Sequence, residues 1–364
     1  MRLIFTGGGT GGHVYPALAV VQALCAGGHG DEVWYMGRGN SIEQTLAERA
    51  GLPFAAVPAA PVRGTGPVRL ALNVANLVRG TWRAAGILRR LRPDAIFATG
   101  GYVSVPVVVA GWLRRTPSLI YLPDMEPGLA VRALARIATR VAVTAEEAAR
   151  HFRAGKVIVT GYPVREEFAA LHRDAARQRL SLADGKVVLV FGGSRGASAL
   201  NKAVEAALED ILEMAELVHV CGEGDYDALS ARRASLPADK QARYRLFAYL
   251  HDLPAAMVAA DLVISRAGAS VLGEFTAAGV PSILVPYPYA GQHQMTNARY
   301  LADHGAAIVI ENDRLGADLL PTVRELLADD ARREAMRESA RRLARPDAAQ
   351  ALAQVLRSLA AEGV

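Results

Sequence analysis

Three polar side chains between Asp261 and Asn297 have the types and spacing of a nucleotide-sugar site. Glu274 is expected near the start of a helix, where its carboxylate can accept hydrogen bonds from both hydroxyls of a ribose while the helix amides favour phosphate. Gln294 and Asn297 are three residues apart, so one helical turn places both amides on one face. Paired amides suit a sugar, because sugar hydroxyls both donate and accept hydrogen bonds.

Two strand ends and one helix start are expected to hold these side chains. Leu262–Ser265 is a short apolar run typical of a buried parallel strand, and Pro281–Pro286 is the next strand. Between them lies a small-residue turn with Ala269 and Ser270, and Ser270 is expected to cap the helix. Ligands of open α/β sheets bind at such strand ends. Taken alone, each piece is better explained as a helix cap or an exposed amide pair; together they favour a nucleotide-sugar site.

Length and composition indicate a globular α/β protein with two domains. The 364 residues are too many for one ordinary core, and the chain is 51% hydrophobic and 21% charged. A net charge of +5 allows an anionic substrate or membrane surface and does not by itself indicate nucleic acid. Cys25 and Cys221 lack metal-ligand spacing, as expected for reduced cysteines of a cytoplasmic protein. Met1–Phe5 is interpreted as a first strand rather than a signal peptide, and no apolar run is long enough to cross a membrane.

A glycine turn follows this first strand. Five glycines between Thr6 and His13 permit sharp bends and close approach to a ligand, and Pro16 is expected to start a helix. Such a turn can cradle phosphate, but NAD binding requires an acid at the end of the second strand, where Gly37–Arg38 stands. His13 lies where strand meets helix. It is either a structural histidine or a general base near neutral pH.

A second glycine turn, with Gly100, Gly101 and Tyr102, follows the buried strand Asp94–Ala98. Further along, Asp124 and Glu126 lie in a loop where acidic residues are most often solvated. The strand that starts at Val157 ends in a Gly/Pro break, and we place the domain boundary there. The predicted domains are residues 1–162 and 163–345, and a final helix over 346–364 is expected to return to the first domain.

The second half restarts the pattern of the first. Val187–Phe191 is an apolar strand, and Gly192–Asn201 is a third glycine turn that opens a helix. The predicted fold class is therefore α/β, with two Rossmann-like doubly wound domains facing a cleft.

Tryptophans and arginines occur together in two segments of the first half. A helix predicted over about Pro67–Arg92 contains Trp82, and Trp112 ends the next helix. A charged face over a buried apolar stripe is the simpler interpretation. Basic side chains beside tryptophans also fit a patch that lies on anionic lipid. This predicted membrane patch comprises Trp82, Trp112, Arg79, Arg83, Arg114 and Arg115.

In combination, the motifs resemble those of the bacterial N-acetylglucosaminyltransferases that form lipid II, in glycosyltransferase family 28. The resemblance runs in order along nearly the whole chain. It is carried by Gly8–Ala17, Gly100–Ser104, Gly192–Ala197, Arg266–Ser270, Glu274 and His293–Ala298.

This resemblance implies a GT-B fold, with acceptor binding by the first half and UDP-N-acetylglucosamine binding by the second. Glu274 would hold the ribose, and the backbone near Leu250 would contact uracil. Arg165 and Ser194 would face the diphosphate, and the first glycine turn with His13 would face the acceptor and the reacting centre. The donor-binding residues expected in this way are Thr10, Gly11, Gly12, Arg165, Ser194, Leu250, Ala269, Ser270, Glu274, Gln294 and Asn297. Gly100, Gly101, Tyr102 and Asp124 are expected on the acceptor side.

The chain departs from the family pattern at two places in its first half. Tyr121–Asp124 stands where the family has His-Glu-Gln-Asn, and Gly161–Pro163 stands where it has Gly-Asn-Pro. Both departures concern acceptor binding or the cleft, so the donor half fits the resemblance more closely.

The resulting hypothesis is an inverting transfer of N-acetylglucosamine to the 4-hydroxyl of the N-acetylmuramyl residue of lipid I. His13 is the candidate base and Asp124 the reserve. No cofactor or catalytic metal is expected. The expected partners are UDP-N-acetylglucosamine, the polyprenyl-linked acceptor, an anionic membrane surface on the cytoplasmic side and other cell-wall synthesis proteins. The alternatives are another GT-B glycolipid synthase, a UDP-N-acetylglucosamine epimerase and a non-catalytic UDP-sugar-binding partner of a cell-wall complex.

Overall fold

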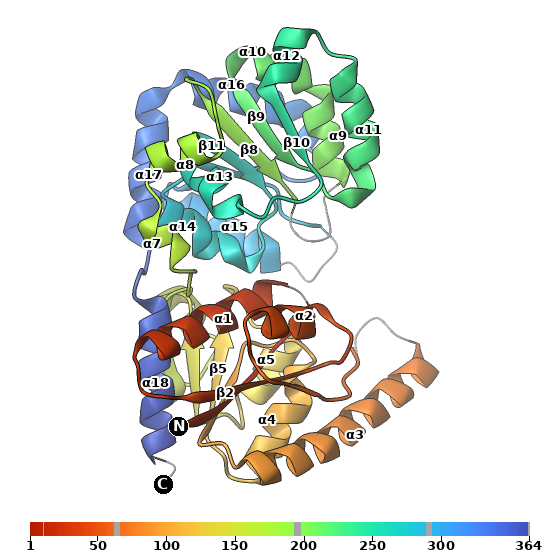
Figure 1. The fold of residues 1–364 in the computed structure, drawn as a ribbon, viewed down its shortest axis with the longest axis vertical. Coiled ribbons are helices and arrows are strands. Elements are labelled where there is room, and N and C mark those ends of the chain that lie inside the picture. Colours follow the sequence, from red (N-terminus) through yellow and green to blue (C-terminus); the bar gives the residue numbers. More distant parts are fainter. Residues whose placement is uncertain (10, 62–65, 193–197, 289–292, 363–364) are drawn as a thin grey trace. The chain divides into compact units, whose positions relative to one another are not determined.

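The computed structural model describes residues 1–9, 11–61, 66–192, 198–288 and 293–362. The chain forms two compact units (Figure 1). Unit 1 comprises Met1–Arg165 and Arg345–Val364, and unit 2 comprises Glu166–Ala344.

Unit 1 contains, in its described part, a parallel sheet of seven strands in the order β3-β2-β1-β4-β5-β6-β7. The order reverses beside β1, as in doubly wound sheets, where ligands bind outside the carboxyl ends of the strands. The strands are β1 (Arg2–Thr6), β2 (Glu32–Gly37), β3 (Phe54–Ala56), β4 (Ala95–Ala98), β5 (Ser118–Leu122), β6 (Arg140–Val143) and β7 (Val157–Val159).

Helices cover this sheet, and one of them comes from the far end of the chain. In α18 (Ala348–Glu362), Leu352, Leu356 and Leu359 are buried in a core shared with α1 (Gly11–Ala26) and β1, and α18 lies against α1 (Figure 1). The other helices are α2 (Ile42–Arg49), α3 (Pro67–Leu91), α4 (Ser104–Leu113), α5 (Leu129–Leu134), α6 (Glu146–Ala149) and η1 (Ala154–Lys156).

Unit 2 repeats the architecture. Its described part holds six parallel strands in the order β10-β9-β8-β11-β12-β13. These are β8 (Val187–Phe191), β9 (Glu216–Val220), β10 (Tyr244–Phe247), β11 (Leu262–Ser265), β12 (Ser282–Leu284) and β13 (Ala307–Val309). The helices are α7 (Glu167–Ala170), α8 (Arg173–Arg179), α9 (Ser198–Ala206), α10 (Leu208–Met214), α11 (Glu223–Ala234), α12 (Ala238–Arg243), α13 (Leu253–Ala259), η2 (Ala269–Leu272), α14 (Glu274–Ala278), α15 (His293–Asp303), α16 (Leu315–Ala328) and α17 (Asp330–Leu343). The expected α/β fold class is confirmed.

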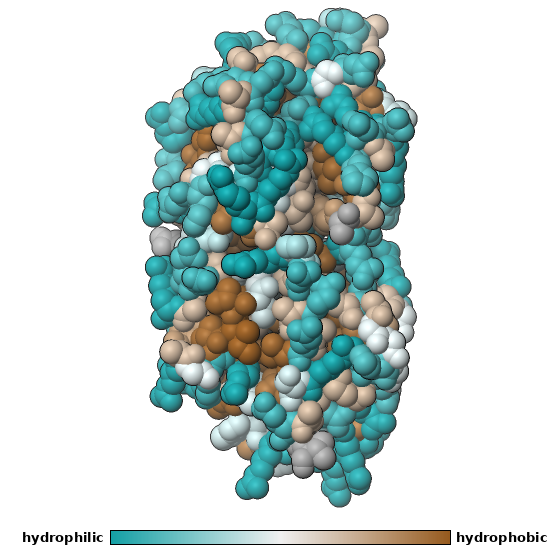
Figure 2. Space-filling view, turned by 90° about the vertical axis from the view of Figure 1, so that its left-hand side faces the viewer, coloured by the Kyte–Doolittle hydropathy of each residue, from teal (hydrophilic) through white to brown (hydrophobic). Residues whose placement is uncertain are grey.

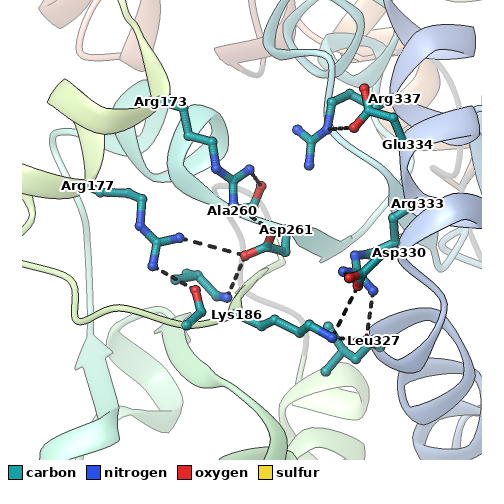
Figure 3. Close-up of polar contacts among 12 residues, drawn as sticks. Arg173, Arg177, Lys186, Ala260, Asp261, Leu327, Asp330, Arg333, Glu334 and Arg337 are labelled. Carbon is teal, nitrogen blue, oxygen red and sulfur yellow. Dashed lines mark hydrogen bonds and ion pairs between the residues drawn. The ribbon is translucent and has the colours of Figure 1, made fainter.

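A charged network fastens the amino ends of two central strands of unit 2 (Figure 3). Asp261, just before β11, accepts a hydrogen bond from Arg173 of α8 at 2.6 Å and another from the amide of Val187 in β8 at 2.9 Å. Lys186 pairs with Asp330 of α17 at 3.3 Å. These bonds lie at the amino ends of the strands, whereas the predicted donor residues follow the carboxyl ends, so the network supports the scaffold.

Two expected helix starts are wrong. Helix α1 begins at Gly11 and contains Pro16, which had been expected at its first position. The missing N–H of a proline removes only one helical bond, so a helix can tolerate it near its start. Ser270 is not a helix cap, because it lies inside the 3₁₀ turn η2 and α14 follows from Gly273 without a side-chain cap.

Candidate active site

His13 lies in the first turn of α1 with its ring orientation fixed. Its Nδ1 lies 2.8 Å from the carbonyl oxygen of Thr99, which can only accept a hydrogen bond, so Nδ1 carries the proton in this contact. The hydroxyl of Thr99 donates to the carbonyl oxygen of His13 at 2.7 Å. In the neutral imidazole, Nε2 is then the basic nitrogen. The half-buried ring can therefore take a proton at Nε2 while Nδ1–H stays bonded to the backbone.

The first two glycine turns pack directly on each other beside His13. A Cβ at Gly101 would come within 2.4 Å of the carbonyl oxygen of Gly8, and one at Gly100 would lie 3.5 Å from the His13 ring. Gly100 and Gly101 also have φ of +97° and +77°, which side chains rarely adopt. Tyr102 is adjacent, since a Cβ at Gly9 would lie 3.7 Å from its ring. Unit 1 thus gathers His13, Gly100, Gly101 and Tyr102 at the carboxyl ends of β1 and β4.

The loop that was predicted on the acceptor side is anchored by a buried tyrosine. The hydroxyl of Tyr121 donates to the carbonyl oxygen of Gly161 at 3.2 Å and lies 2.9 Å from the hydroxyl of Thr144. Thr144 in turn reaches the carbonyl oxygens of Leu122 and Pro123. Burial raises the pKa of Tyr121, so the phenol stays protonated and can donate. Tyr121 therefore holds the backbone of the loop, and the half-buried Asp124 follows it.

Arg165, the last residue of the first segment of unit 1, lies over the ring of Tyr15 with its guanidinium carbon 5.4 Å from the ring centroid. This cation–π contact orients the guanidinium near the start of α1. The sequence singled out Arg165 but not Tyr15, which belongs to the same helix turn as His13.

In unit 2, the predicted sugar amides occupy α15. Asn297 is completely buried and donates to the carbonyl oxygen of Ala267 at 3.1 Å, whereas Gln294 accepts from the amide of Tyr287 at 2.9 Å. Arg266 donates to the carbonyl oxygen of Val285 at 3.2 Å, and burial lowers the pKa of its guanidinium. Asn297 and Arg266 thus stabilise the turn that follows β11.

The remaining predicted donor residues that the structure describes in unit 2 lie at the carboxyl end of the same sheet. Glu274 is the first residue of α14 and is half-buried, and Ser270 and Ala269 precede it in η2. Leu250 follows β10 and is half-buried. Thr10 and Ser194, two further predicted donor residues, lie outside the described residues.

A polar network that the sequence did not reveal supports the start of α9. His219, buried in β9, lies 3.0 Å from both the hydroxyl of Tyr244 and Oδ1 of Asn201. Asn201 donates to the carbonyl oxygen of Cys221 and to the carboxylate of Asp225. Burial lowers the pKa of His219 to about 4, so it is neutral at pH 7, with Nε2–H donating to Asn201. This network fixes the helix that follows the third glycine turn.

Asp225 and Asp227 have the Asp-X-Asp spacing of some metal sites, but Asp225 accepts a hydrogen bond from Asn201 at 2.6 Å. In the part of the chain that the structure describes, no three His, Cys, Asp or Glu side chains could together hold a metal ion.

The residues of the predicted membrane patch are exposed, whereas Ile87 and Leu88 of the same predicted apolar stripe are buried. Trp82 is 78% exposed on α3, and Trp112 is 52% exposed at the end of α4, which packs against α3. Arg79, Arg83, Arg114 and Arg115 are exposed as well. We call these six residues the tryptophan patch. Among the described residues, no helix is long and apolar enough to cross a membrane.

Comparisons with known proteins cover both units. The glycosyltransferase family 28 N-terminal domain matches residues 3–143, and the family 28 C-terminal domain matches residues 187–352. Two relatives, from Roseiflexus sp. and Desulforudis audaxviator, are 42% and 41% identical over 99% and 100% of this chain and 95% and 100% of their own lengths. Both are named UDP-N-acetylglucosamine–N-acetylmuramyl-(pentapeptide) pyrophosphoryl-undecaprenol N-acetylglucosamine transferases. The crystal structure of Acinetobacter baumannii MurG matches with a TM-score of 0.77 and 28% identity, over 98% of this chain and 99% of that one.

Two doubly wound units, matched over nearly their full length by the MurG structure, define a GT-B glycosyltransferase. More narrowly, the chain belongs to glycosyltransferase family 28.

Proposed function

We propose that this chain transfers N-acetylglucosamine from UDP-N-acetylglucosamine to the 4-hydroxyl of the N-acetylmuramyl residue of undecaprenyl-pyrophosphoryl-MurNAc-pentapeptide. The product is lipid II, so the enzyme serves peptidoglycan synthesis, cell-wall biogenesis, cell shape and cell division. The observation that carries this function is the end-to-end match, above 40% identity, to transferases named for this reaction. The fixed orientation of His13 in unit 1 is consistent with it.

On the acceptor side, His13 acts as the general base. Its Nε2 takes the proton of the acceptor hydroxyl as that oxygen attacks the anomeric carbon of the sugar. The bond from this carbon to UDP breaks, and the configuration inverts. The bond from Nδ1–H to Thr99 keeps the ring in place while the charge on the imidazole changes. Asp124 remains the reserve base, in a loop that Tyr121 and Thr144 anchor.

On the donor side, Glu274 accepts from the ribose hydroxyls and the backbone near Leu250 contacts uracil. Gln294 holds the sugar. Asn297 contributes by fixing the turn that contains Ala269 and Ser270, because its side chain is buried against Ala267. We further assign Arg165, Ser194 and the first glycine turn, with Thr10, Gly11 and Gly12, to the diphosphate and the reacting centre, where donors stabilise the departing UDP.

The tryptophan patch is the proposed contact with the cytoplasmic face of the membrane. A polyprenyl-linked acceptor stays in the bilayer, so a peripheral enzyme has to approach the headgroups. Exposed tryptophans favour the interfacial zone, and each nearby arginine adds about 1 kcal/mol of attraction to anionic lipid. Apolar residues next to the tryptophans are exposed too, among them Val78 and Leu113. Figure 2 shows the opposite side of unit 1 from α3, so the tryptophan patch is not seen there; hydrophobic side chains gather over part of that side.

Incubation with labelled UDP-N-acetylglucosamine and a short-chain lipid I analogue tests the function. We expect label to move to the lipid-linked acceptor with release of UDP, and the rate to be unchanged by a chelator. Donor affinity without transfer to any polyprenyl acceptor would instead indicate a non-catalytic UDP-sugar-binding protein. Conversion of the donor alone to an epimer would indicate an epimerase.

A further inference from the structure

A carboxylate lies buried beneath the first glycine turn. Glu43, in the first turn of α2, is only 1% exposed. Its Oε2 accepts a long hydrogen bond, 3.4 Å, from the amide of Gly9. Its Oε1 is buried and has no hydrogen-bond partner among the residues that the structure describes. Burying a carboxylate with so few partners costs stability, so packing alone does not account for a glutamate here.

The turn above this carboxylate has no room to move. A Cβ at Gly8 would come within 2.6 Å of the carboxyl carbon of Glu43. On its other side, a Cβ at Gly7 would come within 1.9 Å of the hydroxyl of Thr99. The buried Tyr35 also donates to the carbonyl oxygen of Gly7 at 2.7 Å. The turn is therefore held between Glu43 on one side and Thr99 on the other, and Thr99 is the residue that binds the His13 ring.

The direction of the Gly9 amide also limits what the turn can do. In a phosphate cradle, the amides of a glycine turn point at the ligand. Here the Gly9 amide points at Glu43 instead. The Gly9 amide thus helps to fix the start of α1 and is engaged within the protein rather than directed at a ligand.

We propose that Glu43 is a positioning residue for the glycosyl transfer. Its carboxylate accepts from the first glycine turn and holds it in place. Through the turn, it keeps the start of α1 where His13 bonds to Thr99 and presents Nε2. This inference rests on the proposed function.

Two variants of similar size separate the hydrogen bond from the packing. Glu43→Gln keeps an oxygen that can accept from Gly9, whereas Glu43→Leu fills a similar volume without an acceptor. We expect the leucine variant to lower kcat at least about 30-fold, because small misplacements of a reacting group have large effects on rate. We expect the glutamine variant to stay within about fivefold of the wild type. The KM for UDP-N-acetylglucosamine should be unchanged in both. Glu48→Gln, on the exposed part of the same helix, is the matched control and should have no effect.

A measurement on the folded protein covers the case in which the leucine variant is unstable. In ¹⁵N NMR spectra, the His13 ring, assigned by its absence in His13→Asn, should show the Nδ1–H tautomer in the wild type. In Gly8→Ala, the new methyl group should push against the Glu43 carboxylate from the side of the glycine turn. We expect this variant to have less of the Nδ1–H tautomer and a lower kcat. The double variant Gly8→Ala/Glu43→Leu should lose little more kcat than either single variant. Equal kcat in the leucine and glutamine variants, a donor KM that rises with the loss of kcat, or an unchanged His13 tautomer in Gly8→Ala would each overturn the proposal. Absence of transfer by the wild type would instead refute the proposed function.

Discussion

Removal of the His13 ring is the most direct test of the proposed chemistry. His13→Asn is the best substitution, because the asparagine Nδ2 can take the place of the imidazole Nδ1 and still donate to Thr99. The basic Nε2 is lost. The variant therefore keeps the contact that anchors the start of α1 and removes only the atom that accepts the proton.

Loss of the His13 ring should raise the activation barrier much more than it lowers the free energy of unfolding. A general base contributes about two to four orders of magnitude to the rate. At about 1.36 kcal/mol per decade, the barrier should rise by about 2.7–5.4 kcal/mol. The ring makes one hydrogen bond, of 2.8 Å, and is half-buried, so even His13→Ala should lower the free energy of unfolding by only about 0.5–1.5 kcal/mol. The asparagine variant should lose less than that.

Steady-state transfer, donor binding and thermal unfolding should be measured on the same preparations. We expect kcat to fall about 100-fold to 10,000-fold in both variants, with donor affinity and unfolding temperature close to those of the wild type. His29→Asn, at an exposed site just after α1, is the control and should leave kcat unchanged. A kcat within about threefold of the wild type in His13→Asn would show that His13 is structural, and Asp124 would become the candidate base. Loss of donor affinity in parallel with kcat would make His13 a binding residue.

Three further predictions concern other parts of the molecule. Glu274→Ala should weaken UDP-sugar binding by about 1.5–3 kcal/mol in a titration, with native circular dichroism, because the ribose loses a charged acceptor; unchanged affinity would remove Glu274 from the site. Replacing the four arginines of the tryptophan patch by glutamine should reduce binding to anionic vesicles and its salt dependence while UDP affinity stays the same; binding indifferent to these changes would move the contact to another surface. Burial lowers the pKa of His219 in the folded state to about 4, so as the pH falls the unfolded chain takes up a proton before the folded protein does. The free energy of unfolding should therefore decrease by up to about 3 kcal/mol between pH about 6.5 and pH about 4. Denaturant unfolding of His219→Gln between pH 7 and pH 5 should therefore depend less on pH than that of the wild type, and equal slopes would contradict this assignment.

Long apolar runs made most of the sheets predictable. Runs such as Val187–Phe191 and Leu262–Ser265 are buried over their whole length and sit where the sequence placed them. Strand β3 was missed, because Phe54–Ala56 is too short to show a period. Strand β13 was missed although it lies in the apolar run Ala306–Ile310. The start of α1 was placed too late, because a proline is more often found at a helix start than inside the helix.

Candidate site residues could be predicted where an unusual residue stands out in its local sequence. They could not be predicted where only tertiary contacts make a residue part of the site. His13 among glycines drew attention at once, and the structure gives its ring a defined partner. Glu43 was missed, because a glutamate in the first turn of a polar helix usually faces solvent. Here the first glycine turn and Gly37 both approach its side chain, and it is buried. For Trp82 the sequence left a buried stripe and an exposed patch both open, because spacing along a helix does not reveal which face the rest of the chain covers.

The return of α18 to unit 1 has a consequence for how the protein is made. Unit 2 is one uninterrupted stretch, Glu166–Ala344, and is complete on the ribosome before α18 has been synthesised. Until then, the side of α1 that packs on Leu352 and Leu356 stays uncovered. At ~5–20 residues per second, synthesis of unit 2 takes about 10–40 seconds, and α1 stays uncovered for at least that time. His13 therefore lies on a helix whose packing is finished last, and chains released before α18 would have a folded unit 2 and an incomplete unit 1.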